Sequence, residues 1–145
     1  MSYGLQSYKT SRATTASRED LLIMLYEGAI RFLELAIVEK EAKNLAEHKL
    51  NLRKGLAIIS ELQSTLDFQK GGEVAIKLFE LYGFMLDYLT QANLTQDVSY
   101  IREVINQLST LLDGWRVAIK QVKASATGAT PGAGTVPGRS ISKSL

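Results

Sequence analysis

The chain has 145 residues, two prolines, no cysteine and a net charge of +2. This length suits one domain with one hydrophobic core, and the lack of cysteine excludes disulfides, thiolate metal sites and a cysteine nucleophile. Residues 17–123 hold all 15 acidic and 13 of the 17 basic residues, so this part carries −2 and the two ends are basic. The sequence has no concentrated basic stripe, which argues against a nucleic-acid partner.

No stretch approaches the roughly 18 apolar residues of a membrane span, and the N-terminus lacks the apolar block of a signal peptide. We therefore expect a soluble, cytoplasmic protein without membrane insertion.

The stretch from Thr15 to Leu33 predicts a helix that begins near Arg18. Ser17 can accept a hydrogen bond from a free amide of the first turn, and Asp20 completes a pair that resembles a capping box. Two apolar stripes follow, formed by Leu22, Leu25, Tyr26, Ala29, Leu33 and Ala36, and by Ile23, Ile30 and Ile37. Such a helix needs a core or a partner.

A second helix is predicted from Leu45 to Asp67, with Asn44 as its cap and a break at Gly71 and Gly72. Its apolar repeat consists of Leu45, Leu52, Leu56, Ile59, Leu62 and Leu66.

A third helix is predicted to end near Asn93, and a fourth, capped by Asp97, runs from Val98 to Val122. The core stripe expected on the third helix is Val74, Leu78, Leu81, Met85 and Leu89. Because both prolines lie in the last fifteen residues and the connections are short, we expect an all-α fold, an antiparallel four-helix bundle over residues 17–123.

The two ends differ in composition from this body. Residues 124–145 are rich in Gly, Ser and Pro and have no acidic residue, which predicts a disordered tail. Residues 1–16 are expected to form a flexible arm, in which Tyr3, Leu5 and Tyr8 could dock on the body.

The residues that could carry chemistry are few. The single histidine, His48, is interpreted as a surface residue rather than a metal ligand. Carboxylates at helical spacing, such as Glu80 and Asp87, are typical of a solvated face. We find no catalytic, metal or cofactor site, and the sequence favours a protein that is not an enzyme.

Apolar residues on the third helix exceed what one core requires. Ala75, Phe79, Tyr82, Leu86 and Leu89 form a second stripe, with Phe84 and Tyr88 nearby. Either both stripes pack internally, or one of them is a groove for a partner's helix. Each predicted helix also holds one interior glycine, which favours close helix packing or the approach of another backbone; these are Gly28, Gly55, Gly83 and Gly114.

Several motifs together resemble the flagellar secretion chaperone FliS family. They are TAS at 15–17, LLIMLYEGAI at 21–30, LQSTLDFQKGGEVA at 62–75, LYGFML at 81–86, ANLTQDVSYIREV at 92–104 and DGW at 113–115. The order and spacing agree over about residues 3–123. Arg18 departs from the proline common in the family, and the tail has no counterpart from which a role can be carried over.

The resemblance implies a cytoplasmic chaperone that binds the C-terminal segment of flagellin, prevents premature polymerisation and aids delivery to the flagellar type III export gate. On that basis, the predicted flagellin contacts are Tyr8, Tyr26, Gly28, Phe79, Tyr82, Gly83 and Met85. The N-terminal arm, through Tyr3, Leu5 and Tyr8, is expected to cover part of that surface.

Two other hypotheses remain open at this point. The second stripe could be buried in a structural homodimer with no client, and the oligomeric state expected here is a monomer or a weak homodimer. The enzyme alternative is a helical bundle that holds a metal ion or a cofactor, but the sequence has few residues that could serve as ligands.

Overall fold

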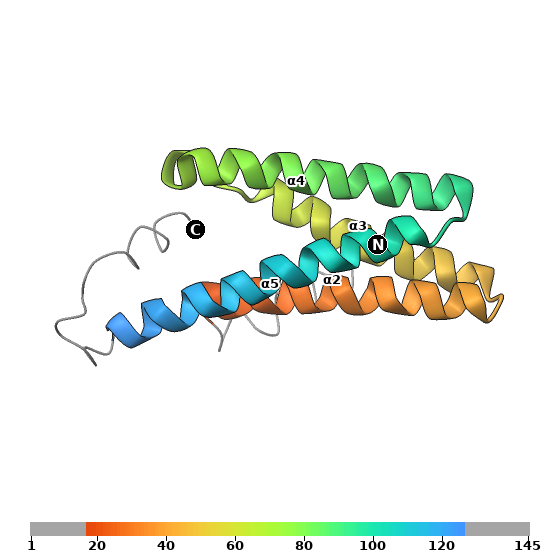
Figure 1. Cartoon of the computed structure of the whole chain (residues 1–145), viewed down its shortest axis with the longest axis horizontal. Coiled ribbons are helices and arrows are strands. Elements are labelled where there is room, and N and C mark those ends of the chain that lie inside the picture. The colour runs from red at the N-terminus through yellow and green to blue at the C-terminus, as the bar shows by residue number, and fades with distance from the viewer. Residues whose placement is uncertain (1–16, 127–145) are drawn as a thin grey trace.

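A computed structural model describes residues 17–126 of the chain, which form four helices. They are α2 (Arg18–Glu41), α3 (Leu45–Ser64), α4 (Phe68–Thr95) and α5 (Ser99–Ala126). Helix α2 packs against α3 and α5, and α4 packs against the same two helices from the other side (Figure 1). The predicted all-α antiparallel four-helix bundle is confirmed. The predictions for residues 1–16 and 127–145 lie outside the described residues.

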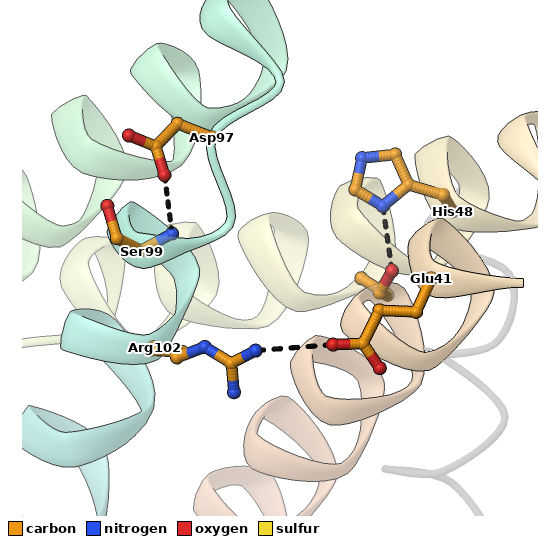
Figure 2. Close-up of polar contacts among 6 residues, drawn as sticks. Glu41, His48, Asp97, Ser99 and Arg102 are labelled. Atoms are coloured by element: carbon orange, nitrogen blue, oxygen red, sulfur yellow. Dashed lines mark hydrogen bonds and ion pairs between the residues drawn. The ribbon is translucent and has the colours of Figure 1, made fainter. Parts of the chain in front are cut away.

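The helix starts follow from local capping chemistry. Ser17 caps α2, its Oγ accepting a hydrogen bond from the Asp20 amide at 3.1 Å. Asp97 does the same for α5, because its Oδ1 accepts from the Ser99 amide at 2.9 Å (Figure 2). Asn44 stands at the N-cap of α3 as predicted, but its side chain makes no capping bond and instead donates to Glu39 Oε1.

The predicted break at Gly71 and Gly72 is a kink near the start of α4. Gly72 has φ 54° and ψ −130°, a backbone conformation that glycine adopts without steric strain. Asp67 caps the turn before the kink, and its Oδ1 accepts from the amides of Gln69 and Lys70. The helix ends at Thr95, two residues later than expected, where Gln96 takes the left-handed conformation.

The core lies between all four helices. Its fully buried large side chains include Tyr26 and Leu33 from α2, Ile58 and Ile59 from α3, Tyr82 and Met85 from α4, and Ile101 and Leu108 from α5. The core stripe predicted for α4 is wrong in part, since Val74 is 42% exposed and Leu81 is only half-buried. The residues that α4 buries are Gly71, Ala75, Leu78, Tyr82, Met85, Leu89 and Ala92.

His48 corrects a second prediction, because it is 1% exposed rather than a surface residue. It recurs at a spacing of seven with Gly55 and Leu62 on the buried face of α3. Its Nδ1 donates to the carbonyl oxygen of Ala36 on α2 at 2.7 Å (Figure 2). The hydrogen bond replaces water for one ring nitrogen and joins the two helices.

Gly55 lets α3 and α2 approach closely. A Cβ atom at this position would lie 2.6 Å from Leu33 Cδ2 and 2.9 Å from Leu33 Cγ. Close packing is thus the reason for this glycine, but not for Gly114, around which a Cβ would meet nothing within 4 Å.

These two glycines give opposite stability predictions. We expect Gly55→Ala to lower the free energy of unfolding by about 1–3 kcal/mol, because the overlap with the buried Leu33 outweighs the gain in helix propensity. Gly114→Ala is the matched control, and it should raise the free energy of unfolding by about 0.5–1 kcal/mol. Urea denaturation followed by circular dichroism measures both, and a stabilised Gly55→Ala variant would contradict the packing argument.

Candidate functional site

Exposed apolar side chains gather on α4. Of the ten large hydrophobic residues that are exposed in the described part of the chain, six belong to this helix: Phe68, Val74, Ile76, Phe79, Phe84 and Leu94. The other four are divided among α2, α3 and α5. Single exposed hydrophobic residues are ordinary, whereas a cluster on one element is typical of an interaction surface.

One part of this surface borders α3, and we call Ile76, Phe79, Gly83 and Leu86 the α4 strip. The four residues are spaced by three and four, so they follow one face of the helix. Gln63 of α3 reaches this face, because its Nε2 donates to the carbonyl oxygen of Phe79 at 3.0 Å. A Cβ added at Gly83 would lie 3.3 Å from the same Nε2. The strip therefore lies along the outer edge of the α3–α4 contact.

The opposite side of α4 carries an aromatic row that continues onto α5. The rings of Phe84 and Tyr88 lie 4.5 Å apart, and Tyr88 meets Tyr100 edge-on at 5.2 Å. Phe84 is 45% exposed, whereas both tyrosines are half-buried. Tyr88 packs this row against α5, whereas the α4 strip holds two exposed side chains, Ile76 and Phe79.

A pocket of about 700 Å³ opens at the end of the bundle where α2 begins and α3 ends. Its lining residues are Arg18, Glu19, Leu21, Leu22, Leu25, Glu61, Leu62, Thr65, Leu66, Asp67, Lys70, Leu78, Tyr82 and Trp115. Leucines and aromatic rings form most of the wall, and the charged residues come from helix ends. Such a pocket suits apolar side chains of a peptide rather than a polar small molecule.

Two buried tyrosines link the pocket to the core. Tyr82 lines the pocket, and its hydroxyl lies 2.5 Å from that of Tyr26 in the centre of the bundle. Burial raises the pKa of both phenols above the ordinary value, and the neighbouring Tyr26 raises that of Tyr82 further. The Tyr82 hydroxyl and the Trp115 indole lower the pKa of Tyr26, but by less than burial raises it. Both rings therefore favour the neutral phenol.

The structure separates the predicted contact residues into three groups. Tyr26 and Met85 are 0% exposed and Tyr82 is 2% exposed, so they are core residues in this conformation, and Gly28 is buried as well. Phe79, at 45% exposure, and the half-buried Gly83 lie on the α4 strip.

The third group is Tyr8, which lies outside the described residues, as do Tyr3 and Leu5, the other residues predicted for docking of the arm. Client binding stays a prediction for the seven contact residues, and docking stays a prediction for the three arm residues.

Sequence reasoning missed Phe68 and Ile76 as surface residues. Ile76 stands three residues before Phe79 and seven before Gly83, so the same helical periodicity could have grouped them. Phe68 lies beyond the predicted break at the two glycines, yet its ring packs on Phe79 with centroids 5.8 Å apart. Helical spacing could not predict the contact between Phe68 and Phe79, because the kink at Gly72 interrupts the helix between them.

Among residues 17–126, no group of three or more His, Asp or Glu side chains is placed to hold a metal ion. None of the described helices combines the length and the apolar character that a membrane span requires.

The tyrosine pair predicts a loss of stability at alkaline pH. Because the folded-state pKa values are raised above about 10, the unfolded chain releases these protons first, and the free energy of unfolding should fall as pH rises past 10. Each phenol contributes up to about 1.4 kcal/mol per pH unit. The variant Tyr26→Phe/Tyr82→Phe should show a shallower fall in urea titrations between pH 8 and 11. Below pH 9 the two proteins should differ by a constant amount, and equal slopes above pH 10 would contradict the assignment.

The chain is similar to known proteins over nearly all of the residues that the structure describes. A family model described as flagellar protein FliS matches residues 1–122. The flagellar secretion chaperone FliS of Campylobacter jejuni is 38% identical over 110 residues, which cover 76% of this chain and 86% of that protein. The FliS of Salmonella typhimurium is 37% identical over 107 residues, with coverages of 73% and 79%, and that of Bacillus subtilis is 30% identical over 122 residues, with coverages of 84% and 90%. The resemblance found in the motifs is confirmed, and the chain belongs to the FliS family of flagellar secretion chaperones.

Proposed function

We propose that this protein is a cytosolic chaperone that binds the C-terminal segment of flagellin, masks it against premature polymerisation and aids its delivery to the flagellar type III export apparatus. It acts by binding alone, without catalysis. The relatives it matches are described as flagellar secretion chaperones, which supports a secreted protein as client. The α4 strip carries the proposal within this chain.

The strip has the form that an amphipathic client helix needs. Ile76 and Phe79 are 50% and 45% exposed, and they lie at the spacing at which a helix in a groove presents its own anchors. Burying one such side chain fully contributes about 1.5–3 kcal/mol. Because a disordered segment loses entropy when it orders on binding, a few such anchors must be joined by a long wrapped interface.

The pocket at the end of the bundle provides a second place for apolar anchors. Arg18 and Glu19 line its rim, so the residues that precede Ser17 begin beside it. We propose that the arm, residues 1–16, covers this pocket through Tyr3, Leu5 and Tyr8 when no client is bound. The arm and the client then compete for one apolar surface.

A structural homodimer is the alternative use of the same surface, and the α4 strip would then face a second copy. Light scattering distinguishes the two. A tight dimer that stays closed to the flagellin segment would favour the homodimer and contradict the chaperone proposal.

Phe79 gives the direct test of the strip. We expect Phe79→Asp to weaken binding of a flagellin C-terminal peptide by about 30-fold or more, as for a central interface anchor. Isothermal titration calorimetry measures the affinity. Val117→Asp is the matched control, because Val117 is 59% exposed on α5, away from the strip, and its affinity should stay within about twofold. Equal affinities for the two variants would remove the strip from the binding surface.

Deletion of residues 1–16 tests the arm. If the arm competes with the client, the shortened chain should stay folded and bind the peptide with equal or higher affinity, because no ordered contact has to be displaced. Calorimetry and thermal unfolding of the full and shortened chains supply the comparison. A large loss of affinity would show that the arm forms part of the client site.

A further inference from the structure

Four cations gather on the outer side of the contact between α2 and α3. They are Arg31 on α2 and Lys49, Arg53 and Lys54 on α3. The Lys54 ammonium nitrogen lies 5.3 Å from the centre of the Phe32 ring, so Lys54 and Arg31 lie at the same level of the two helices. Lys49 and Arg53 stand one turn apart, which makes their side chains neighbours on α3. We call these four residues the basic face.

The buried contact between the two helices shows that this face points outward. A Cβ atom at Gly55 would lie 2.6 Å from Leu33 Cδ2, so these two positions meet between α3 and α2. Arg53 stands two residues before Gly55, which is about 160° around the helix. Arg31 stands in the same relation to Leu33. Both arginines are exposed, and they project away from the core within about one turn of that contact.

The basic face has no acidic partner on α2. None of its four cations forms an ion pair with another residue in the range 17–126. Glu27 and Glu41 are instead paired with arginines of α5. Glu34 stands seven residues from each of them, so it belongs to the same row, on the side of α2 that faces α5.

The carboxylates of α3 do not neutralise the basic face either. Glu47 and Glu61 stand seven residues before and after Lys54, which places them about 10.5 Å away along the helix and beyond ion-pair distance. Residues 17–123 carry a net charge of −2, yet four positive charges are concentrated here. Because these cations come from two helices, the linear sequence shows no basic stripe.

The basic face surrounds an apolar centre. Leu35 is 38% exposed, and Phe32 and Leu50 are half-buried. Leu35 follows Phe32 by one turn on α2, and Leu50 precedes Lys54 by one turn on α3. The Arg31 guanidinium carbon lies 5.9 Å from the centre of the Phe32 ring, so cations from both helices border one aromatic side chain. The contact with the ring orders these cations without neutralising their charge.

We propose that the basic face is a docking surface for an acidic amphipathic helix of a second partner protein, separate from the client surface on α4. Packed helices lie about 8–10 Å apart, so one helix laid over the α2–α3 contact reaches both. Its apolar side chains contact Phe32 and Leu35, and its carboxylates pair with Arg31 on one edge and Arg53 on the other. The inference stands on these residues alone and does not depend on the proposed function.

Charge complementarity selects this occupant. Like charges held close together repel one another in the free chain, and a partner of opposite charge relieves that repulsion. A phosphate backbone would also supply negative charge, but it would leave the apolar centre without a partner. An acidic helix with an apolar stripe satisfies both parts of the surface.

Two designed helical peptides supply the probe. Both carry Leu at heptad positions a and d and a dye at the N-terminus; one has Glu at positions e and g, and the other has Lys there. Fluorescence anisotropy with the full chain measures their affinities. We expect the Glu peptide to bind about tenfold more tightly than the Lys peptide, and this difference should shrink at about 0.5 M salt because the charges are exposed.

Charge reversal on α3 ties the binding to the basic face. Lys49→Glu/Arg53→Glu should weaken the Glu peptide by about tenfold or more and strengthen the Lys peptide. Both side chains are exposed, so thermal unfolding should stay close to that of the wild type. Lys77→Glu/Lys120→Glu is the matched control, because it makes the same change of charge at exposed positions of α4 and α5. Its affinity for the Glu peptide should stay within about threefold.

A neutral substitution tests the apolar centre. Leu35→Gln should weaken the Glu peptide by about fivefold, since it removes an apolar contact and leaves every charge in place. Val117→Gln is the control, because Val117 is 59% exposed on α5, far from the basic face in the chain, and its affinity should be unchanged.

The remaining outcomes would overturn the inference. Equal affinities of the two charge variants for the Glu peptide would remove the basic face from the binding surface. Binding to vesicles of equal parts phosphatidylserine and phosphatidylcholine, without binding of the Glu peptide, would indicate a membrane surface instead. Displacement of the Glu peptide by a flagellin C-terminal peptide would make the face part of the client site. Failure of the flagellin peptide to bind the wild-type chain would remove the proposed function alone.

Discussion

Helix α4 packs mainly against two of the other three helices, α3 and α5, and meets α2 through the Tyr26–Tyr82 pair. One face of the helix, from Gly71 to Ala92, lies in the core. Its apolar residues extend beyond that face, and two neighbours do not cover them. Phe79 and Ile76 remain exposed beside α3, while Tyr88 finds cover against Tyr100 of α5. A bundle that must bind a partner needs such surplus apolar surface, because surface that is already buried has no free energy left to contribute.

The opposite helix, α2, is held much more completely. Gly55 allows α3 to approach Leu33, and His48 joins α3 to the Ala36 carbonyl. Ion pairs such as Arg102 with Glu41 lie along the contact with α5 (Figure 2). Exposed pairs of this kind contribute little stability each, so the close packing carries more of it. The α2 side of the bundle is thus held by close packing, whereas the α4 side keeps exposed apolar side chains.

Between these sides, the Tyr26–Tyr82 pair connects the core to the pocket. The two hydroxyls satisfy each other where water is excluded, which permits large aromatic rings in the centre of the bundle without an unpaired polar group. Tyr82 also lines the pocket, so its ring serves the core on one side and faces the pocket on the other. Because Tyr82 borders both the core and the pocket, the helical spacing of the sequence was compatible with a core residue and with a contact residue.

The sequence by itself determined the four helices, their starts at Ser17 and Asp97, the antiparallel order and the family, because capping, periodicity and short connections are local properties. The rotation of α4 about its axis was decided only in the tertiary structure. That helix is apolar on several faces, so spacing alone allowed Val74 and Leu81 as core residues as readily as Ala75 and Tyr82. The positions of α3 and α5 selected among these faces, and the same packing placed His48 inside the bundle. Burial depends on which neighbours a helix meets, and neighbours far apart in sequence leave no local signal of their contact.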